Sequence, residues 1–368
     1  MLTYPLEGMD VKEAVAAQFK MIDCITKVFQ GHEMLSRGDL GVVPGFNKPV
    51  TTYKAEQVIA DFFDAESCVL VRGAGSGAIR LGLSAMMPPG SKILIHDAPV
   101  YSTTSISMEM MGLDLKKADF NNLADIERAL GQDPDIRGGA LIQYTRQKPE
   151  DSYDMETVIG TIRKCADILI LTDDNYAVMK MSRTGVQCGA DLSCFSSFKL
   201  LGPEGVGIVI GKKRYTDKII GWNYSGGMQV QGHEAMDVLR GLTYAPVSLA
   251  IEAEVGKECV RRLKAGEIDG IKDAFLANAQ SKIVLVEFEE DIAAQVLEEA
   301  ERSGAAPNPV GAESKYEIVP MFYRLSGTFR KADPALEKRM IRINPMRGGA
   351  DTVLRILKRA VESVKICL

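Results

Sequence analysis

The chain has 368 residues, 46% of them hydrophobic, and a formal net charge of -5 with acidic and basic residues mixed along its length. That length allows one large and one smaller domain. The even spread of charge argues against nucleic acid as a partner, and no stretch approaches the roughly 20 apolar residues of a membrane span.

The first half of the chain predicts helices and strands in alternation. Apolar residues at helical spacing predict a helix over 10–30 that ends before Gly31. We then expect helices at 53–64, from Gly77, at 102–111 and at 154–166, and strands at 67–71, 92–96, 140–144 and 167–172. Such alternation is typical of a mostly parallel sheet with helices on both faces.

The second half predicts further strands, a long helix and a smaller mixed unit. Strands at 191–198 and 205–211 precede a polar turn and a helix at 233–265, and later strands at 281–289, 316–325 and 340–345 alternate with helices at 291–304 and 350–365. We therefore predict an α/β fold, a three-layer αβα arrangement around a mainly parallel sheet. Its expected parts are an N-terminal helix and loop (1–45), a large cofactor-binding domain (46–235), and a linker helix with a small C-terminal α+β domain (236–368).

The cysteine and histidine content favours a cytoplasmic protein. Seven cysteines without a C-x-x-C pair are typical of reduced thiols rather than of a disulfide framework or structural zinc. The three histidines lie far apart in the sequence, so we expect no metal site. The N-terminus lacks the basic and apolar regions of a signal peptide.

The stretch RGAGSGAIR (72–80) predicts a phosphate site. It follows a strand and opens a helix, so the free N–H groups of that helix and the Ser76 hydroxyl could bind an anion, with Gly75 and Gly77 allowing close approach. The same glycines also fit a dinucleotide-binding fingerprint, with Asp97 as the ribose-binding acid. The loop alone leaves both ligands open.

Two further segments carry reactive groups. Asp173 and Asp174 stand at the carboxyl end of a buried strand, where ligands collect in α/β sheets, although either could simply cap the next turn. Lys199 lies between apolar segments with Glu204 as the one other charge in 195–211. An amine with restricted hydration is a nucleophile toward carbonyls, which is Schiff-base chemistry. An amine, an acid and phosphate donors together are what pyridoxal 5′-phosphate requires.

These segments resemble the fold type I pyridoxal-phosphate enzymes, the aspartate aminotransferase superfamily. Residues 74–80 are similar to its phosphate loop, with Ala74 in place of serine. The run Lys199-x-x-Gly-Pro-x-Gly-x-Gly resembles the one that follows the Schiff-base lysine in class V aminotransferases and cysteine desulfurases. Several longer strings, including HDAPVYSTT and FKLLGPEGVG, resemble a bacterial branch called YhfS-like.

The resemblance implies a role for individual residues. It assigns Tyr101 to stacking on the cofactor ring, as in the Cys/Met-metabolism enzymes, and Ser196 to the phosphate. The match of Asp173–Tyr176 to Asp-x-x-Tyr makes Asp173 the partner of the ring nitrogen and places Tyr176 in the site, with Asp174 as the alternative partner.

The resemblance also implies a substrate site and a second subunit. Arg342, in Arg-hydrophobic-Asn, would bind the substrate α-carboxylate, with Arg324 as a second candidate. Ser225 and Gly226 resemble the segment that closes the phosphate site of a neighbouring subunit, so we expect a homodimer.

We expect an aminotransferase that acts on an amino acid, with Lys199 as both anchor and proton carrier. A β- or γ-elimination lyase of the Cys/Met-metabolism type is the alternative that Tyr101 supports. An NAD(P)-dependent oxidoreductase is a distant one, because it leaves Lys199 and Arg342 unexplained, and a non-catalytic cofactor sensor is another. Candidates for recognition of the substrate side chain are Tyr53, Gln143, Arg146 and Tyr316.

Overall fold

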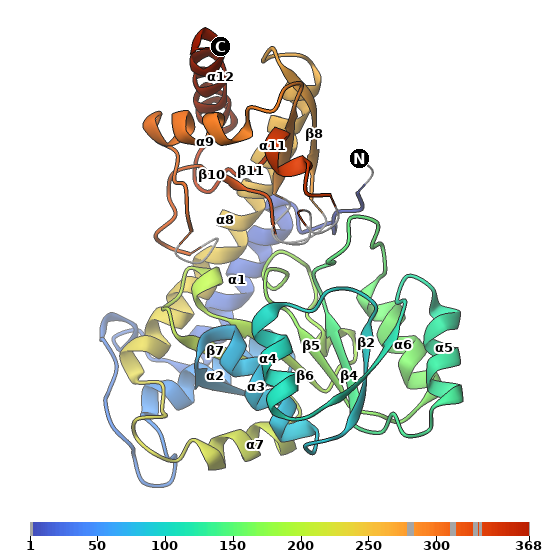
Figure 1. Cartoon of the computed structure of the whole chain (residues 1–368). Coiled ribbons are helices and arrows are strands. Elements are labelled where there is room, and N and C mark those ends of the chain that lie inside the picture. Colours follow the sequence, from blue (N-terminus) through green and yellow to red (C-terminus); the bar gives the residue numbers. More distant parts are fainter. Residues whose placement is uncertain (1–2, 278–282, 310–313, 327–329, 331–332, 368) are drawn as a thin grey trace.

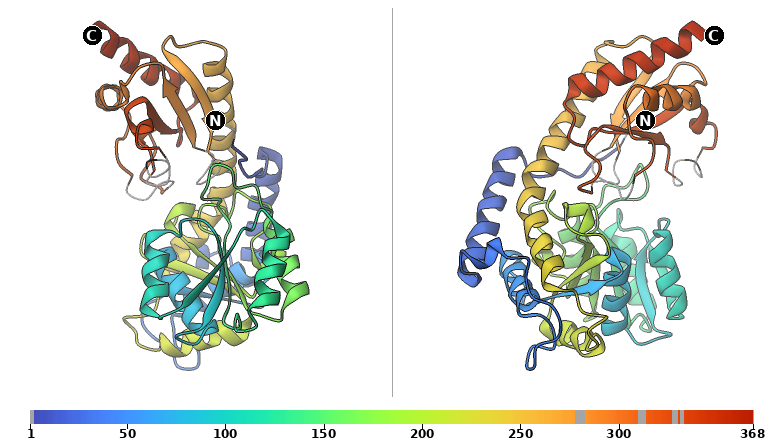
Figure 2. Two further views of the ribbon diagram at one scale, coloured as in Figure 1. Left: turned by 45° about the vertical axis from the view of Figure 1, so that its right-hand side comes forward. Right: turned by 90° about the vertical axis from the view of Figure 1, so that its left-hand side faces the viewer.

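A computed structural model describes residues 3–277, 283–309, 314–326, 330 and 333–367 (Figure 1). It contains a seven-stranded sheet in the larger part of the molecule and a four-stranded sheet in the smaller part. The 33-residue helix α8 (Gly232–Lys264) runs from one to the other, and α1 (Val11–Val28) lies along it (Figure 2).

The large sheet is parallel except for one strand. In spatial order its strands are β1 (Ser67–Arg72), β7 (Val206–Gly211), β6 (Leu192–Ser196), β5 (Ile170–Asp173), β4 (Gly139–Gln143), β2 (Lys92–His96) and β3 (Asp114–Ala118). Only β7 runs against its two neighbours. The carboxyl ends of the other six therefore meet at one edge, where α/β sheets bind ligands.

Helices cover both faces of this sheet, which confirms the predicted three-layer fold. One face carries α3 (Ala74–Met86), α4 (Ser102–Met110) and α7 (Lys213–Trp222). The other carries α1, α2 (Val50–Phe62), α5 (Leu123–Gln132), α6 (Met155–Cys165) and the first half of α8. Burial on both faces explains why central strands such as β7, VGIVIG, are apolar throughout.

Several predicted boundaries are wrong, each for a local reason. Helix α3 begins at Ala74 rather than Gly77, because Gly73 adopts a left-handed φ of 93° and turns the chain directly off β1. Strand β5 begins three residues later than predicted and includes Asp173. The edge strands β3 and β8 (Ile271–Leu276) were not predicted, since DLKKA and IKDAFL lack a continuous apolar run.

The smaller sheet is antiparallel and places Arg342. Its order is β10 (Met321–Arg324), β11 (Met340–Asn344), β9 (Val284–Phe288) and β8. Helices α9 (Ala293–Arg302) and α12 (Ala350–Cys367) cover one face, while the short α11 (Leu336–Arg339) leads into β11. Arg342 pairs with Tyr323, so both project from the opposite face. Among the residues that the structure describes, no helix is both long enough and apolar enough to span a membrane.

Candidate active site

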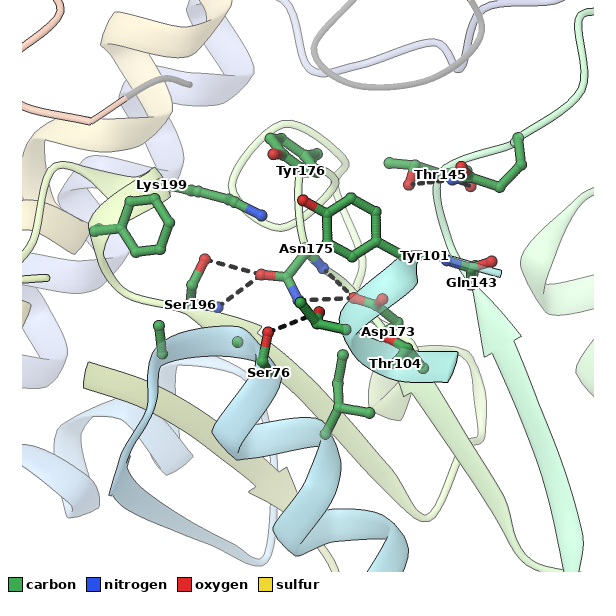
Figure 3. A pocket seen from close by; sticks show the side chains of 16 residues that line it. Ser76, Tyr101, Thr104, Gln143, Thr145, Asp173, Asn175, Tyr176, Ser196 and Lys199 are labelled. Atoms are coloured by element: carbon green, nitrogen blue, oxygen red, sulfur yellow. Dashed lines mark hydrogen bonds between the residues drawn. The ribbon is translucent and has the colours of Figure 1, made fainter. Parts of the chain in front are cut away.

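A pocket with a cavity of about 250 Å³ opens at the carboxyl edge of the large sheet (Figure 3). Its walls come from the start of α3, the start of α4 and the segments that follow β4, β5 and β6. The lining residues are Ala74, Gly75, Ser76, Ile79, Tyr101, Thr103, Thr104, Gln143, Thr145, Gln147, Asp173, Asn175, Tyr176, Ser196, Phe198 and Lys199. The fold thus brings together residues from five separate segments of the sequence.

Lys199 stands at the centre of this group. It lies in a 3-10 turn, Phe198–Leu200, directly after β6, and its Nζ is 3.6 Å from the centre of the Tyr176 ring. The segment that leads from this turn to β7 is tied to the glycine loop, because the N–H groups of Gly73 and Ala74 both donate to the Gly205 carbonyl at 2.9 and 3.1 Å. The amine and the predicted phosphate site therefore share one rigid support.

The structure distinguishes the two aspartates. Asp173 lines the pocket, and burial raises the pKa of its carboxyl, an effect that hydrogen bonds from Asn175 and Gln143 and the charge of Lys199 oppose. Asp174 is fully buried and does not line the pocket. Its Oδ2 accepts a 2.8 Å hydrogen bond from the Gly185 N–H. Burial raises the pKa of Asp174 to about 6. Of the two, Asp173 is the one that could face a ligand.

The glycine loop forms a cradle for an anion. Gly75 and Ser76 lie in the first turn of α3, whose N–H groups have no acceptor within the helix. The Ser76 hydroxyl donates to Thr103 Oγ1 at 2.8 Å. Gly77 does not line the pocket: its N–H donates to the Gly73 carbonyl, and a side chain there would meet the Arg72 carbonyl at 2.1 Å. Gly77 is needed for helix packing rather than for ligand access.

Two tyrosines border the reacting end of the pocket. Figure 3 shows the Tyr101 ring projecting into the pocket with its hydroxyl turned toward Lys199. Tyr101 is 44% exposed, so it stands at the pocket entrance. Tyr176 has a left-handed φ of 65°, an uncommon conformation for a non-glycine residue that often occurs at functional sites.

The candidate arginines lie on different faces of the small sheet. The Arg342 guanidinium packs 4.0 Å from the centre of the Tyr323 ring, its Nε donates to the Arg324 carbonyl at 2.7 Å, and its charge interacts with Tyr176 of the pocket. The side chain of Arg324 lies on the other face, opposite Ile341, and is exposed. Neither arginine is among the residues that line the cavity, and Arg342 is the one whose charge acts on a lining residue, Tyr176.

Ser225 and Gly226 do not line the pocket of their own chain. They lie in an exposed loop between α7 and α8, and Gly226 approaches the Val42 side chain.

The remaining sequence candidates have varied positions. Gln143 lines the pocket, whereas Arg146 donates to the backbone carbonyls of Ser152 and Tyr153. Tyr53 lines a separate cavity, and Tyr316 hydrogen-bonds Glu204. Asp97, the acid that a dinucleotide site would use, is exposed, pairs with Lys117 at 3.4 Å and does not line the pocket.

Sequence reasoning missed several lining residues, among them Thr145, Gln147 and Phe198. The segment after β4 is shaped by Asp151, whose carboxylate accepts hydrogen bonds from the N–H groups of Gln147 and Lys148 and contacts His96 Nε2 at 2.9 Å. No motif signals this fold of the segment. Its position after a parallel strand was the one available clue.

The residues present fit pyridoxal 5′-phosphate. The Thr104 hydroxyl is buried beside the pocket without a hydrogen-bond partner among the described residues, and the lack of a side chain at Gly75 makes room for the Asn175 amide at the pocket wall. An amine, a buried carboxylate and a helix N-terminus border the same cavity. In the described part of the chain, no cluster of three or more His, Cys, Asp or Glu side chains is arranged to hold a metal ion.

Comparison with known proteins agrees with this fit. Residues 49–240 match the family model for aminotransferase class-V, and residues 257–357 match the YhfS-like C-terminal domain. The chain is 52% identical over 365 residues to YhfS of Escherichia coli (strain K12), covering 99% of this chain and all of that protein. The crystal structure of the pyridoxal-5′-phosphate-dependent protein YhfS from Escherichia coli superposes with a TM-score of 0.96 over 99% of this chain and 100% of that one.

More distant relatives share the fold or a segment. A carbon-sulfur lyase from Clostridium novyi NT has a TM-score of 0.71 at 17% identity, over 96% of this chain and 91% of that one. A cysteine desulfurase of Wigglesworthia glossinidia brevipalpis is 35% identical over 74 residues, 20% of this chain and 18% of that protein. The cofactor is thus pyridoxal 5′-phosphate and not a nicotinamide nucleotide. The chain belongs to the class-V aminotransferase family of fold type I pyridoxal-phosphate-dependent enzymes, and within it to the YhfS-like proteins.

Proposed function

We propose that the protein is an aminotransferase that acts on an amino acid. The observation that carries the choice of this reaction is the match of residues 49–240 to the aminotransferase class-V family model, while the meeting of the Lys199 amine, the Asp173 carboxylate and the N-terminus of α3 around one cavity supports chemistry on an amino acid in general. When bound there, pyridoxal 5′-phosphate supplies an electron sink for the bonds at the substrate Cα.

Each residue has a role that follows from its position. Lys199 would hold the cofactor aldehyde and, once released, carry the proton to and from the substrate Cα. Asp173 would keep the ring nitrogen protonated by supplying a fixed negative charge. Arg342 would bind the substrate carboxylate: its Nε is already used by the Arg324 carbonyl, which leaves the two Nη groups for a bidentate contact.

A β- or γ-elimination lyase is the second candidate. It is supported by the placement of Tyr101 at the pocket entrance, beside Lys199, and by the similar fold of the carbon-sulfur lyase. Both reactions start with removal of the same proton, so the arrangement of Lys199 and Asp173 serves either.

The experiment uses the purified, cofactor-loaded protein and a panel of amino acids, each incubated with and without a 2-keto acid. For an aminotransferase we expect a new amino acid that appears only when the keto acid is added. Ammonium release without the keto acid would instead identify the lyase. Lys199→Ala should abolish both products and change the visible absorbance spectrum of the loaded protein, and a variant that kept the spectrum of the unmodified protein would refute the role of Lys199.

We further propose a cytoplasmic homodimer. Six cysteines with described side chains are free thiols, as expected in a reducing compartment. Large apolar side chains near the loop that holds Ser225 are exposed, including Tyr224 at 70% and Trp222 at 48%. Such surfaces are typical of contacts between subunits.

A further inference from the structure

A buried carboxylate, that of Asp151, holds the backbone of the segment that follows β4. Its side chain is 0% exposed, and its Oδ2 accepts hydrogen bonds from the N–H groups of Gln147 and Lys148 at 3.1 and 2.7 Å. The Asp151 N–H donates in turn to the Lys148 carbonyl at 3.1 Å, which closes the turn. Since Thr145 and Gln147 line the pocket, the carboxylate fixes the chain directly beside the ligand site.

The second oxygen of this carboxylate is anchored by His96, at the end of β2. His96 Nε2 lies 2.9 Å from Asp151 Oδ1, and Asn121 Nδ2 donates to the same oxygen at 3.1 Å. The Phe120 N–H lies 3.1 Å from His96 Nδ1, and the Ala118 carbonyl is farther away at 3.4 Å. Because a backbone N–H can only donate, we assign Nδ1 as the acceptor and place the ring proton on Nε2, where it is donated to Asp151.

These donors keep the Asp151 carboxyl ionised and the turn in one conformation. Burial alone would raise the pKa of Asp151, but the hydrogen bonds from His96, the Lys148 N–H and Asn121 outweigh it and lower the pKa. Hydrogen bonds to a charged acceptor are the stronger kind. Strand β2 pairs with β4 in the sheet, so the segment is fixed to the sheet itself.

The segment faces the part of the pocket that lies away from the phosphate cradle. Figure 3 shows Thr145 on the far side of the pocket from Ser76 at the start of α3. Gln147 Nε2 donates to the Thr145 carbonyl at 3.0 Å, so the two residues are held as one unit. Their hydroxyl and amide groups carry no charge and can hydrogen-bond the polar groups of an amino acid.

We propose that Thr145 and Gln147 contact the amino acid part of the substrate, and that Asp151 and His96 are positioning residues that hold them there. Asp151 and His96 do not line the pocket, and they act through the backbone of the segment. The inference rests on the proposed function, because it requires a pocket that holds the cofactor together with an amino acid. It does not depend on which reaction follows.

The test compares two probes that bind the cofactor-free protein: pyridoxal 5′-phosphate and N-(5′-phosphopyridoxyl)-L-alanine, a stable conjugate of the cofactor with an amino acid. Gln147→Ala and Asp151→Asn should each weaken the conjugate roughly fivefold, the usual effect of one lost hydrogen bond, and weaken pyridoxal 5′-phosphate less. The loss in the double variant should be smaller than the product of the two single losses, because Asp151 acts through Gln147.

A pair of substitutions at His96 tests the anchor separately. The amide nitrogen of His96→Gln can still donate to Asp151, so this variant should keep most of the affinity for the conjugate. His96→Leu removes the donor and should weaken the conjugate as Asp151→Asn does. A role in stability alone would not make the affinity follow the hydrogen bond in this way.

Asp191→Asn is the matched control. Asp191 is 1% exposed and accepts hydrogen bonds from the Ile170 N–H and Arg163 Nη2 at 2.8 and 2.7 Å, but it lies before β6 and outside the pocket. Both aspartate variants should unfold at lower urea concentration, whereas only Asp151→Asn should weaken the conjugate. Circular dichroism confirms that each variant is folded.

The inference is wrong if Asp151→Asn and His96→Leu bind the conjugate as the unmodified protein does, or if the losses from Asp151→Asn and Gln147→Ala multiply. Failure of the unmodified protein to bind the conjugate at all is a different result. It would contradict the proposed function, and this inference with it.

Discussion

Gly75 shows how a single missing side chain can make room for a neighbouring side chain at the wall of the site. A methyl group at this position would lie 2.5 Å from Asn175 Oδ1, much closer than non-bonded atoms approach. The same residue contributes to the wall of the pocket at the start of α3. Its substitution should therefore act on the Asn175 side chain and on ligand access together.

We predict that Gly75→Ala lowers the affinity for pyridoxal 5′-phosphate at least tenfold and lowers the free energy of unfolding by about 1–3 kcal/mol, as expected for overpacking. Gly160→Ala is the matched control, because Gly160 lies in helix α6 with open space where the methyl group would be. It should leave binding unchanged and stabilise the protein slightly. Cofactor titration and urea unfolding measure both effects, and equal affinities for the two variants would contradict the prediction.

Asp174 should give the protein a distinctive pH dependence. Its folded pKa of about 6 lies above the ordinary value of 3.8, so the neutral form is favoured in the fold. The stability that it contributes is complete below pH 3.8 and is lost as the pH rises to about 6. At about 1.4 kcal/mol per pKa unit, the loss is at most about 3 kcal/mol.

Asp174→Asn should remove this dependence of the unfolding free energy on pH. We expect the difference in unfolding free energy between the unmodified protein and the variant to change between pH 4 and pH 6 and to stay constant from pH 7 upward. Urea unfolding at each pH provides the measurement. Asp167→Asn, at an exposed position, is the control, and its unfolding free energy should change with pH as that of the unmodified protein does. A parallel curve for Asp174→Asn would show that this carboxyl titrates normally.

At the scale of elements, Glu56 of helix α2 forms a buried ion pair with Lys48 and also accepts a hydrogen bond from the large sheet. Lys48 Nζ lies 2.6 Å from Glu56 Oε2, both side chains are almost fully buried, and Glu56 Oε1 accepts a hydrogen bond from the Leu70 N–H of β1 at 2.9 Å. Removing one charge of such a pair leaves the other without compensation. The pair therefore fixes how α2 sits on the strand that leads into the glycine loop.

We predict that Lys48→Met lowers the free energy of unfolding by about 3–5 kcal/mol. The double variant Lys48→Met/Glu56→Gln should recover part of that loss, because the amide removes the unpaired charge and keeps an acceptor for Leu70. Urea unfolding at neutral pH measures both. A single variant within about 1 kcal/mol of the unmodified protein would contradict the prediction.

Sequence patterns identified the strands with apolar sequences better than those with charged ones. Buried on both faces, β2 and β4 appear as apolar runs, and β2 has the predicted limits. The edge strand β3 has a mostly exposed, charged sequence that no periodicity distinguishes from a loop. The start of α3 was misplaced because Gly73, Ala74 and Gly75 carry no cap signal, while the left-handed conformation of Gly73 that sets it is invisible in one sequence.

For the whole molecule, the loop that contains Ser225 offers a test of the proposed dimer. If this loop reaches the phosphate site of a second subunit, a carboxylate there would repel the cofactor phosphate. We predict that Ser225→Asp lowers the affinity for pyridoxal 5′-phosphate roughly tenfold, whereas the neutral Ser225→Asn has a smaller effect. Unaltered binding of pyridoxal 5′-phosphate by Ser225→Asp would show that the loop does not reach the phosphate site.

A mixing experiment extends this prediction. In a dimer with shared sites, one chain carrying Lys199→Ala and one carrying Ser225→Asp together form one intact site. We expect the mixture, after exchange of subunits, to gain visible absorbance at a cofactor concentration where neither variant shows it alone. Sedimentation of the unmodified protein should show a mass near twice 40.1 kDa.

The site was predictable where chemistry depends on residue type and unpredictable where it depends on packing. Lys199 and Asp173 carry reactive groups within recognisable patterns, and both line the pocket. Thr145 and Gln147 reach it because a buried aspartate bends their segment, which no local pattern encodes. The choice between Asp173 and Asp174 likewise required the direction of each side chain.

The carbonyl of Gly205 receives the first two N–H groups of the glycine loop, and a methyl group on Gly207 would meet the Ala74 carbonyl at 2.2 Å. The backbone of the segment after Lys199 and that of the glycine loop are therefore in direct contact. Lengthening the 200–205 turn, whether by natural insertion or by engineering, would shift both ends of the cofactor at once. Designers who wish to alter reactivity should accordingly leave this junction untouched and vary the segment after β4.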